Sequence, residues 1–75
     1  MVVDPRLILK KAIELGSVAV ILVHNHPSGT IQPSRADCSV TKKMQSAASM
    51  LEIRVLDHLI VTEKTYFSFA DENLL

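Results

Sequence analysis

The sequence has little cysteine, no excess of basic charge and no long apolar run. Its single cysteine, Cys38, cannot form an internal disulfide, so no oxidative framework stabilises the fold. Eight basic residues balance eight acidic ones, which gives no support to a dedicated surface for nucleic acid or anionic membranes. The longest apolar run, 18–23, is far shorter than the roughly 20 residues that span a bilayer. No signal segment opens the chain either, so we expect a cytoplasmic protein without a membrane span.

The sequence does have enough apolar content to fold. Of its 75 residues 48% are hydrophobic, and its mean hydropathy is +0.26, which excludes a disordered tail. No repeat or linker divides the chain, so we expect residues 1–75 to form a single domain. A chain this short buries only about 60% of the surface that its unfolded form exposes. We therefore expect a metal, a partner or very good packing to supplement its small core.

The first part of the chain predicts a helix and then a buried strand. Asp4 and Pro5 are typical of a helix start and Gly16 of a left-handed stop. These signals predict a helix over 5–15 whose apolar residues are Leu7, Ile8, Ala12, Ile13 and Leu15. Residues 18–23 are β-branched and apolar on both faces, which predicts a central strand covered on both sides.

A loop, a long helix and a hairpin are expected in the rest of the chain. Two prolines and a glycine predict irregular backbone from His24 to Pro33. Ser34 and Asp37 fit a capping box, and the helix that follows continues to about Glu52, with Cys38, Thr41, Met44, Ala47, Ala48 and Leu51 on one face. Residues 53–62 and 65–69 then predict two strands joined by a Glu63-Lys64 turn.

Together these elements predict an α/β fold in the order α-β-loop-α-β-β. A right-handed crossover between the first two strands makes them parallel if they are neighbours. Loops at the carboxyl ends of such strands are where open α/β sheets bind ligands. The loop after the first strand is therefore the expected place for function.

Residues suited to metal binding lie in that loop and at the start of the second helix. His24 and His26 are one residue apart at the end of a strand, so both imidazoles lie on one face. Asp37, in the first turn of the helix, can add a carboxylate oxygen. Three protein ligands leave an open position on zinc for an acidified water, which is typical of a hydrolytic site. Ser34, one turn before Asp37, can present its hydroxyl to the oxyanion that forms when water attacks a carbonyl.

This pattern resembles the JAMM signature of the JAB/MPN metalloprotease superfamily, whose spacing is reproduced by His24-x-His26, Ser34 and Asp37. The chain is more narrowly similar to the RadC-like branch, through the segments 24–29, 33–37, 57–58 and 68–69. The resemblance runs from about Asp4 to Leu75. It implies a truncated, JAB/MPN-like (cytidine-deaminase-like) layered fold. It also implies a Zn²⁺ ion held by His24, His26 and Asp37, with Ser34 as a catalytic residue in the hydrolysis of peptide or isopeptide bonds.

The chain departs from the family at the general base. JAMM enzymes take this glutamate from a strand upstream of the first helix, and only residues 1–3 precede Asp4 here. Glu14 and Glu52 are expected at the far end of the sheet, about 20 Å or more from His24. Glu63 is the sole candidate within the chain. We therefore expect little or no hydrolysis by this chain alone, and whether it is an enzyme stays open.

Two other functions stay open, a metal-binding scaffold or interaction module and an accessory role in DNA repair, which the family label suggests. Direct contact with nucleic acid has no support from the charge balance. Ser34 and Asp37 would cap the helix even without a metal. Cys38 is expected to pack in the core, and His58 to be a hydrogen-bonded structural residue beside Asp57 rather than a fourth ligand. The expected partners are a peptide or protein substrate and a second copy of the chain, paired through an exposed sheet edge.

Overall fold

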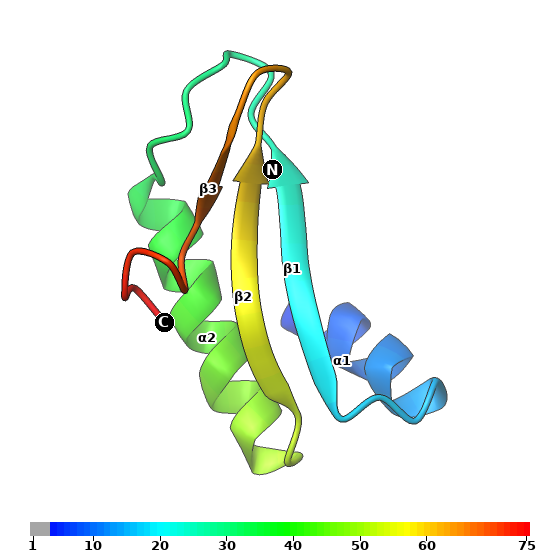
Figure 1. Ribbon diagram of the computed structural model, residues 1–75. Helices are drawn as coiled ribbons and strands as arrows, with labels where there is room; N and C mark the ends of the chain where they lie inside the picture. Colours follow the sequence, from blue (N-terminus) through cyan, green and yellow to red (C-terminus); the bar gives the residue numbers. More distant parts are fainter. Residues whose placement is uncertain (1–3) are drawn as a thin grey trace.

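A computed structural model describes residues 4–75, and residues 1–3 of the predicted single domain lie outside the described part. Its elements are α1 (Pro5–Glu14), β1 (Ala19–Asn25), α2 (Arg35–Met50), β2 (Arg54–Val61) and β3 (Tyr66–Ser68) (Figure 1). The predicted order and the α/β class are confirmed, and each element ends within two residues of its predicted bounds. Neither helix in residues 4–75 combines the length and apolarity needed to cross a membrane.

Both helices begin at the residues that predicted their start. At α1 the Asp4 carboxylate accepts a hydrogen bond from the backbone N–H of Arg6 (3.0 Å), and Pro5 occupies the first turn. At α2 the Ser34 hydroxyl accepts from the backbone N–H of Asp37, whose carboxylate accepts in turn from the backbone N–H of Ser34. This reciprocal pair fixes the first turn of α2 and with it the direction of the Asp37 side chain.

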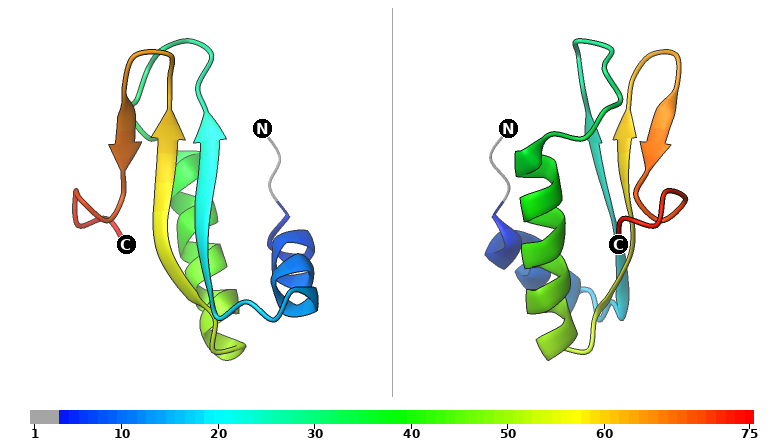
Figure 2. Two further views of the ribbon diagram at one scale, coloured as in Figure 1. Left: turned by 45° about the vertical axis from the view of Figure 1, so that its right-hand side comes forward. Right: turned by 90° about the vertical axis from the view of Figure 1, so that its left-hand side faces the viewer.

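The three strands form one mixed sheet in the order β1-β2-β3. Strands β1 and β2 are parallel, while β2 and β3 are antiparallel. The register skips Leu56, because Val20 pairs with Val55 and Ile21 with Asp57. Beyond this irregularity Leu22 lies opposite His58. The carboxyl ends of β1 and β2 and the first turn of α2 therefore meet at one end of the molecule (Figure 2).

The core lies between the sheet and α2, with α1 packed on the same side (Figure 2). Its buried residues come from both helices and from the residue just before β2, namely Leu9, Ala12, Met44, Ala48 and Ile53. Ile60 and Phe69 are also buried, nearer the site end of the sheet. Because both helices cover one face, the other face of the sheet carries no helix within the described residues.

The prediction that residues 18–23 form a central strand covered on both sides is wrong for the described residues. Strand β1 lies at an edge of the sheet. Leu22 packs toward the core, but Ile21 and Val23 on the opposite face are 54% and 59% exposed. An apolar run predicts that both faces of a strand are suited to burial. It does not show which other segments, if any, bury each face.

The apolar face predicted for α1 is also only partly correct. Leu9 and Ala12 are the buried residues, whereas Leu7, Ile13 and Leu15 are exposed. Helix α1 packs on the core mainly through Leu9 and Ala12, so the apolar residues on its other sides stay in contact with water. At the end of α2, Leu51 likewise lies exposed beyond the last helical turn.

Candidate metal centre

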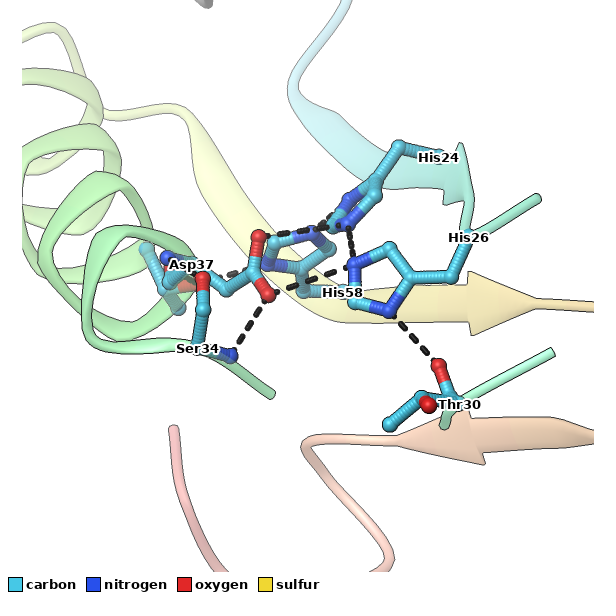
Figure 3. Close-up of polar contacts among 7 residues, drawn as sticks. His24, His26, Thr30, Ser34, Asp37 and His58 are labelled. Carbon is cyan, nitrogen blue, oxygen red and sulfur yellow. Dashed lines mark hydrogen bonds and ion pairs between the residues drawn. The ribbon is translucent and has the colours of Figure 1, made fainter. Parts of the chain in front are cut away.

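Three side chains from two elements converge at the carboxyl end of β1. His24 lies in β1, His26 follows it directly, and Asp37 lies in the first turn of α2 (Figure 3). The Nε2 atoms of the two histidines are 2.9 Å apart. Asp37 places Oδ1 3.2 Å from Nε2 of His24 and Oδ2 3.4 Å from Nε2 of His26. The structure thus brings together the three residues predicted as ligands, and their ligand atoms all lie within 4.8 Å of one another.

The backbone explains why the two histidines share a face. The N–H of His26 donates to the carbonyl of Val61 (3.0 Å), so the ladder between β1 and β2 continues past Asn25. Side chains two residues apart on an extended strand point the same way. The chain then turns, because the N–H of Gly29 donates to the His26 carbonyl and Gly29 has a φ of +85°.

The turn also fixes which nitrogen of His26 carries the proton. Nδ1 of His26 lies 2.7 Å from the carbonyl oxygen of Thr30 (Figure 3). A carbonyl oxygen only accepts, so Nδ1 is the protonated nitrogen of this ring. With its single proton on Nδ1, an imidazole presents the Nε2 lone pair, here to His24 and Asp37. This is the arrangement that a metal-binding histidine requires, with its second nitrogen held by a backbone carbonyl.

Burial and hydrogen bonding set the charges at the site. The side chains of His24 and Asp37 are only 9% and 7% exposed. Burial lowers the pKa of His24, although the Asp37 carboxylate opposes that shift. Burial would raise the pKa of Asp37, but the hydrogen bond from the Ser34 backbone N–H and the neighbouring histidines outweigh burial, and the pKa lies below its usual value. Near neutral pH the site therefore combines a neutral imidazole of His24 with an ionised carboxylate.

Ser34 and Glu63 lie in two neighbouring hollows at this end of the molecule. A cavity of about 270 Å³ contains the three candidate ligands together with Asn25, Pro27, Ser34, Ala36 and Val40. A wider groove runs beside it, and both His26 and Glu63 line this groove. Glu14 and Glu52 instead precede the starts of β1 and β2, at the opposite end of the sheet (Figure 1). Of the carboxylates in residues 4–75, Asp37 is the one that joins the histidines.

Comparison with known proteins identifies the family. Residues 1–74 match the family described as "RadC-like JAB domain". The chain belongs to this family. A "UPF0758 protein" of Haemophilus influenzae is 53% identical over 73 residues, and one of Flavobacterium johnsoniae is 49% identical over 73 residues. Each alignment covers 97% of this chain but only 33% and 32% of those relatives. The chain thus spans about a third of the length of the curated relatives it matches.

In this RadC-like JAB domain His58 supports the site without joining the ligand group. It is 2% exposed, and its ring stacks on Phe69 with centroids 4.6 Å apart and planes inclined by 9°. Its Nε2 lies 2.8 Å from Nδ1 of His24, and its Nδ1 lies 2.6 Å from Oγ1 of Thr41. The prediction of a hydrogen-bonded structural histidine is confirmed. Cys38 is half-buried and stays outside the ligand group of the described residues.

Sequence reasoning missed Thr30 and the polar role of Thr41. Thr41 was expected simply as part of the apolar face of α2, yet its hydroxyl contacts both the Asp37 carbonyl and His58. Its position four residues after Asp37 is a signal that could have found it, because such residues lie on one face of a helix. Thr30 acts through its backbone carbonyl, so its residue type carries no signal.

Asp57 ties β2 to the segment after β3. Its carboxylate accepts from the Ser68 hydroxyl (2.6 Å), from the backbone N–H of Ala70 (3.0 Å) and from the backbone N–H of His58 (2.7 Å). Burial alone would raise the pKa of Asp57, but these three donors lower it overall. The family resemblance at positions 57, 58 and 68 thus corresponds to one hydrogen-bonded group behind the candidate ligands.

Proposed function

We propose that this domain binds one Zn²⁺ ion through His24, His26 and Asp37 and serves a hydrolase that cleaves peptide or isopeptide bonds. The observation that carries the proposal is the convergence of two imidazoles on one carboxylate. Nε2 of His24 and Nε2 of His26 are 2.9 Å apart, Oδ1 of Asp37 lies 3.2 Å from the first, and Oδ2 lies 3.4 Å from the second. Tetrahedral ligands about 2.0 to 2.1 Å from a zinc ion lie roughly 3.3 Å from one another. The donor types therefore fit this metal, and the contacts to the two oxygens of Asp37 lie close to this spacing.

Two imidazole nitrogens and one carboxylate oxygen leave one position of a tetrahedral ion open. Zinc held in this way supplies Lewis acidity and lowers the pKa of water to about 7. The protein residues hold the ligands in place. The backbone N–H of Ser34 fixes Oδ2 of Asp37 at 2.7 Å, and the Thr30 carbonyl fixes the His26 ring.

We propose Ser34 as the residue that stabilises the oxyanion. Its Oγ already accepts a hydrogen bond from the backbone N–H of Asp37 (3.1 Å). A hydroxyl that accepts through a lone pair keeps its own proton, which it can donate to a second partner. Since Ser34 lines the same cavity as the candidate ligands, that second partner would be the carbonyl oxygen of a bound substrate.

The general base is proposed to come from outside residues 4–75. Glu63 is the alternative within the chain, because it lines the groove that reaches His26. The two sources make different predictions. If Glu63 is the base, Glu63→Gln abolishes turnover by this chain. If the base lies elsewhere in a longer protein, this chain binds zinc without turnover, whether or not Glu63 is changed.

Metal analysis of the purified protein tests the zinc site. We expect one zinc per chain in the parent protein and less than a tenth of that in a His24→Ala, His26→Ala double variant. Gln32→Ala, an exposed change in the same loop, is the matched control and should keep full stoichiometry. A double variant that retained the parental zinc content would overturn the proposed ligand set.

Hydrolysis assays on peptide and isopeptide substrates separate an enzyme from a scaffold. Turnover by the chain or by a full-length relative that depends on His24 and His26 supports the hydrolase. Zinc binding without turnover in both proteins would instead assign the domain to a metal-stabilised interaction module. Because basic and acidic residues are balanced, we propose no direct contact with nucleic acid.

A further inference from the structure

A chain of buried hydrogen bonds runs from the backbone of α2 through β2 to the first candidate ligand. The Thr41 hydroxyl donates to the carbonyl oxygen of Asp37 (2.8 Å). Oγ1 of Thr41 also lies 2.6 Å from Nδ1 of His58, and Nε2 of His58 lies 2.8 Å from Nδ1 of His24. Thr41 and His58 are 1% and 2% exposed, so water does not compete for these contacts.

The direction of every bond in this chain follows from its first acceptor. The Asp37 carbonyl only accepts, so the single hydroxyl proton of Thr41 is committed to it. Oγ1 of Thr41 must then accept from Nδ1–H of His58. A neutral imidazole carries one proton, so Nε2 of His58 must accept from Nδ1–H of His24. By the same rule Nε2 of His24 is left without a proton.

We propose that Thr41 and His58 act as a relay that fixes His24 in the tautomer with the proton on Nδ1, so that its Nε2 lone pair faces the metal centre. This inference rests on the proposed zinc site and deepens it. His58 is a positioning residue in this account. Both of its ring nitrogens are already occupied, one by His24 and one by Thr41, which excludes it as a fourth ligand.

The packing of His58 makes the relay rigid. Its ring lies parallel to that of Phe69, and its backbone N–H is held by Asp57 at 2.7 Å. His26 reaches the same tautomer through the Thr30 carbonyl. Both histidines are therefore oriented by groups that add no charge to the site, whereas many metal-binding histidines rely on a carboxylate.

The test compares variants that remove or restore single bonds. His58→Phe keeps an aromatic ring against Phe69 but removes the acceptor for His24, and His58→Gln restores an acceptor and a donor. Thr41→Val removes the hydroxyl at nearly constant volume, and Thr41→Ser restores it. Two readouts are measured above pH ~7.5, where free histidine is neutral. They are the tautomer of His24 in metal-free protein, from the nitrogen chemical shifts of its ring, and the zinc dissociation constant.

We expect His24 in the metal-free parent protein to carry its proton on Nδ1. In His58→Phe that preference should be lost and zinc affinity should fall about 10- to 100-fold, the usual effect of removing an outer partner of a ligand. His58→Gln should recover most of both. Thr41→Val should shift both readouts in the same direction by less, and Thr41→Ser should match the parent protein. A purely structural role would change thermal stability in these variants without changing the tautomer.

The outcomes separate this inference from the proposed function. A parent protein that does not bind zinc refutes the metal site, while the tautomer measurement still tests the relay. A parent His24 protonated on Nε2, or parental tautomer and affinity in His58→Phe, overturns the relay. If His58→Phe does not fold, the Thr41→Val and Thr41→Ser pair decides, and equal tautomers in these two variants would overturn it.

Discussion

Asp37 combines two functions in one carboxylate, the helix cap and the candidate ligand. Oδ2 accepts from the backbone N–H of Ser34, while Oδ1 and Oδ2 face His24 and His26. The cap predicted from the sequence is confirmed, and it does not compete with the second role, because a carboxylate offers about four acceptor positions. The cap and the contacts with the two histidines therefore coexist on one carboxylate, as the sequence allowed.

The two functions of Asp37 can be separated by substitution. Without metal, Asp37→Ala should lower the free energy of unfolding by about 1 kcal/mol, the usual cost of a lost cap. With zinc the loss should be larger, because the folded state also loses the stabilisation that bound metal provides. Denaturant unfolding with and without chelator measures both values. Ser34→Ala is the control and should lose about the same in both conditions, whereas equal losses for Asp37→Ala would leave the cap as its only role.

The lowered pKa of Asp57 predicts how the stability of the fold depends on pH. Since hydrogen bonds lower its pKa in the folded state, the unfolded state takes up a proton first. The contribution of the Asp57 carboxylate to the free energy of unfolding is therefore complete above its unfolded-state pKa of about 3.9. It is lost as the pH falls through its lower pKa in the folded state. Asp57→Asn should cost about 1 to 3 kcal/mol at neutral pH and flatten the decline below pH ~4. Unfolding curves across this range test it, and Asp71→Asn, at an exposed position, should keep the parental decline.

At the scale of elements, local signals predicted the ends of helices and strands well. Caps, prolines and glycines act within a few residues, so Ser34 and Gly16 predicted the start of α2 and the end of α1. Contacts between elements were harder to predict. The burial of Leu9 depends on where α1 meets α2, and the link from His58 to Thr41 depends on a register between β2 and α2 that no local pattern encodes.

The end of α1 gives an element-scale prediction. Gly16 has a φ of +67°, and a methyl group at its Cβ position would meet no atom within 4 Å. Gly16→Ala should therefore destabilise the protein by about 1 kcal/mol through backbone strain alone. Gly16→Asn should cost less, because asparagine tolerates the left-handed conformation better. Denaturant unfolding of the three proteins measures this, and an unchanged stability for Gly16→Ala would contradict the explanation.

At the scale of the whole molecule, the outer face of the sheet carries exposed apolar side chains beside the polar pair Asp57 and Ser68. The register places Ile21 and Val23 on the same face as Leu59, Val61 and Tyr66. Ile21, Val23 and Tyr66 are 54%, 59% and 59% exposed. Strand β1 also has one edge without a partner strand within residues 4–75. An apolar face beside a free strand edge is a surface that recruits another chain.

We propose that this chain associates with a second copy through that face and edge. Sedimentation should show mass that increases with protein concentration, and thermal stability should rise with concentration as well. An Ile21→Lys, Val23→Lys double variant should shift the equilibrium to monomer, since two charges oppose burial of the face. Leu7→Lys changes an equally exposed apolar residue on α1 and should leave the equilibrium in place. A parent chain that is well folded and strictly monomeric at all concentrations would refute the association. The zinc site would be unaffected by that result, because its three ligands come from a single copy.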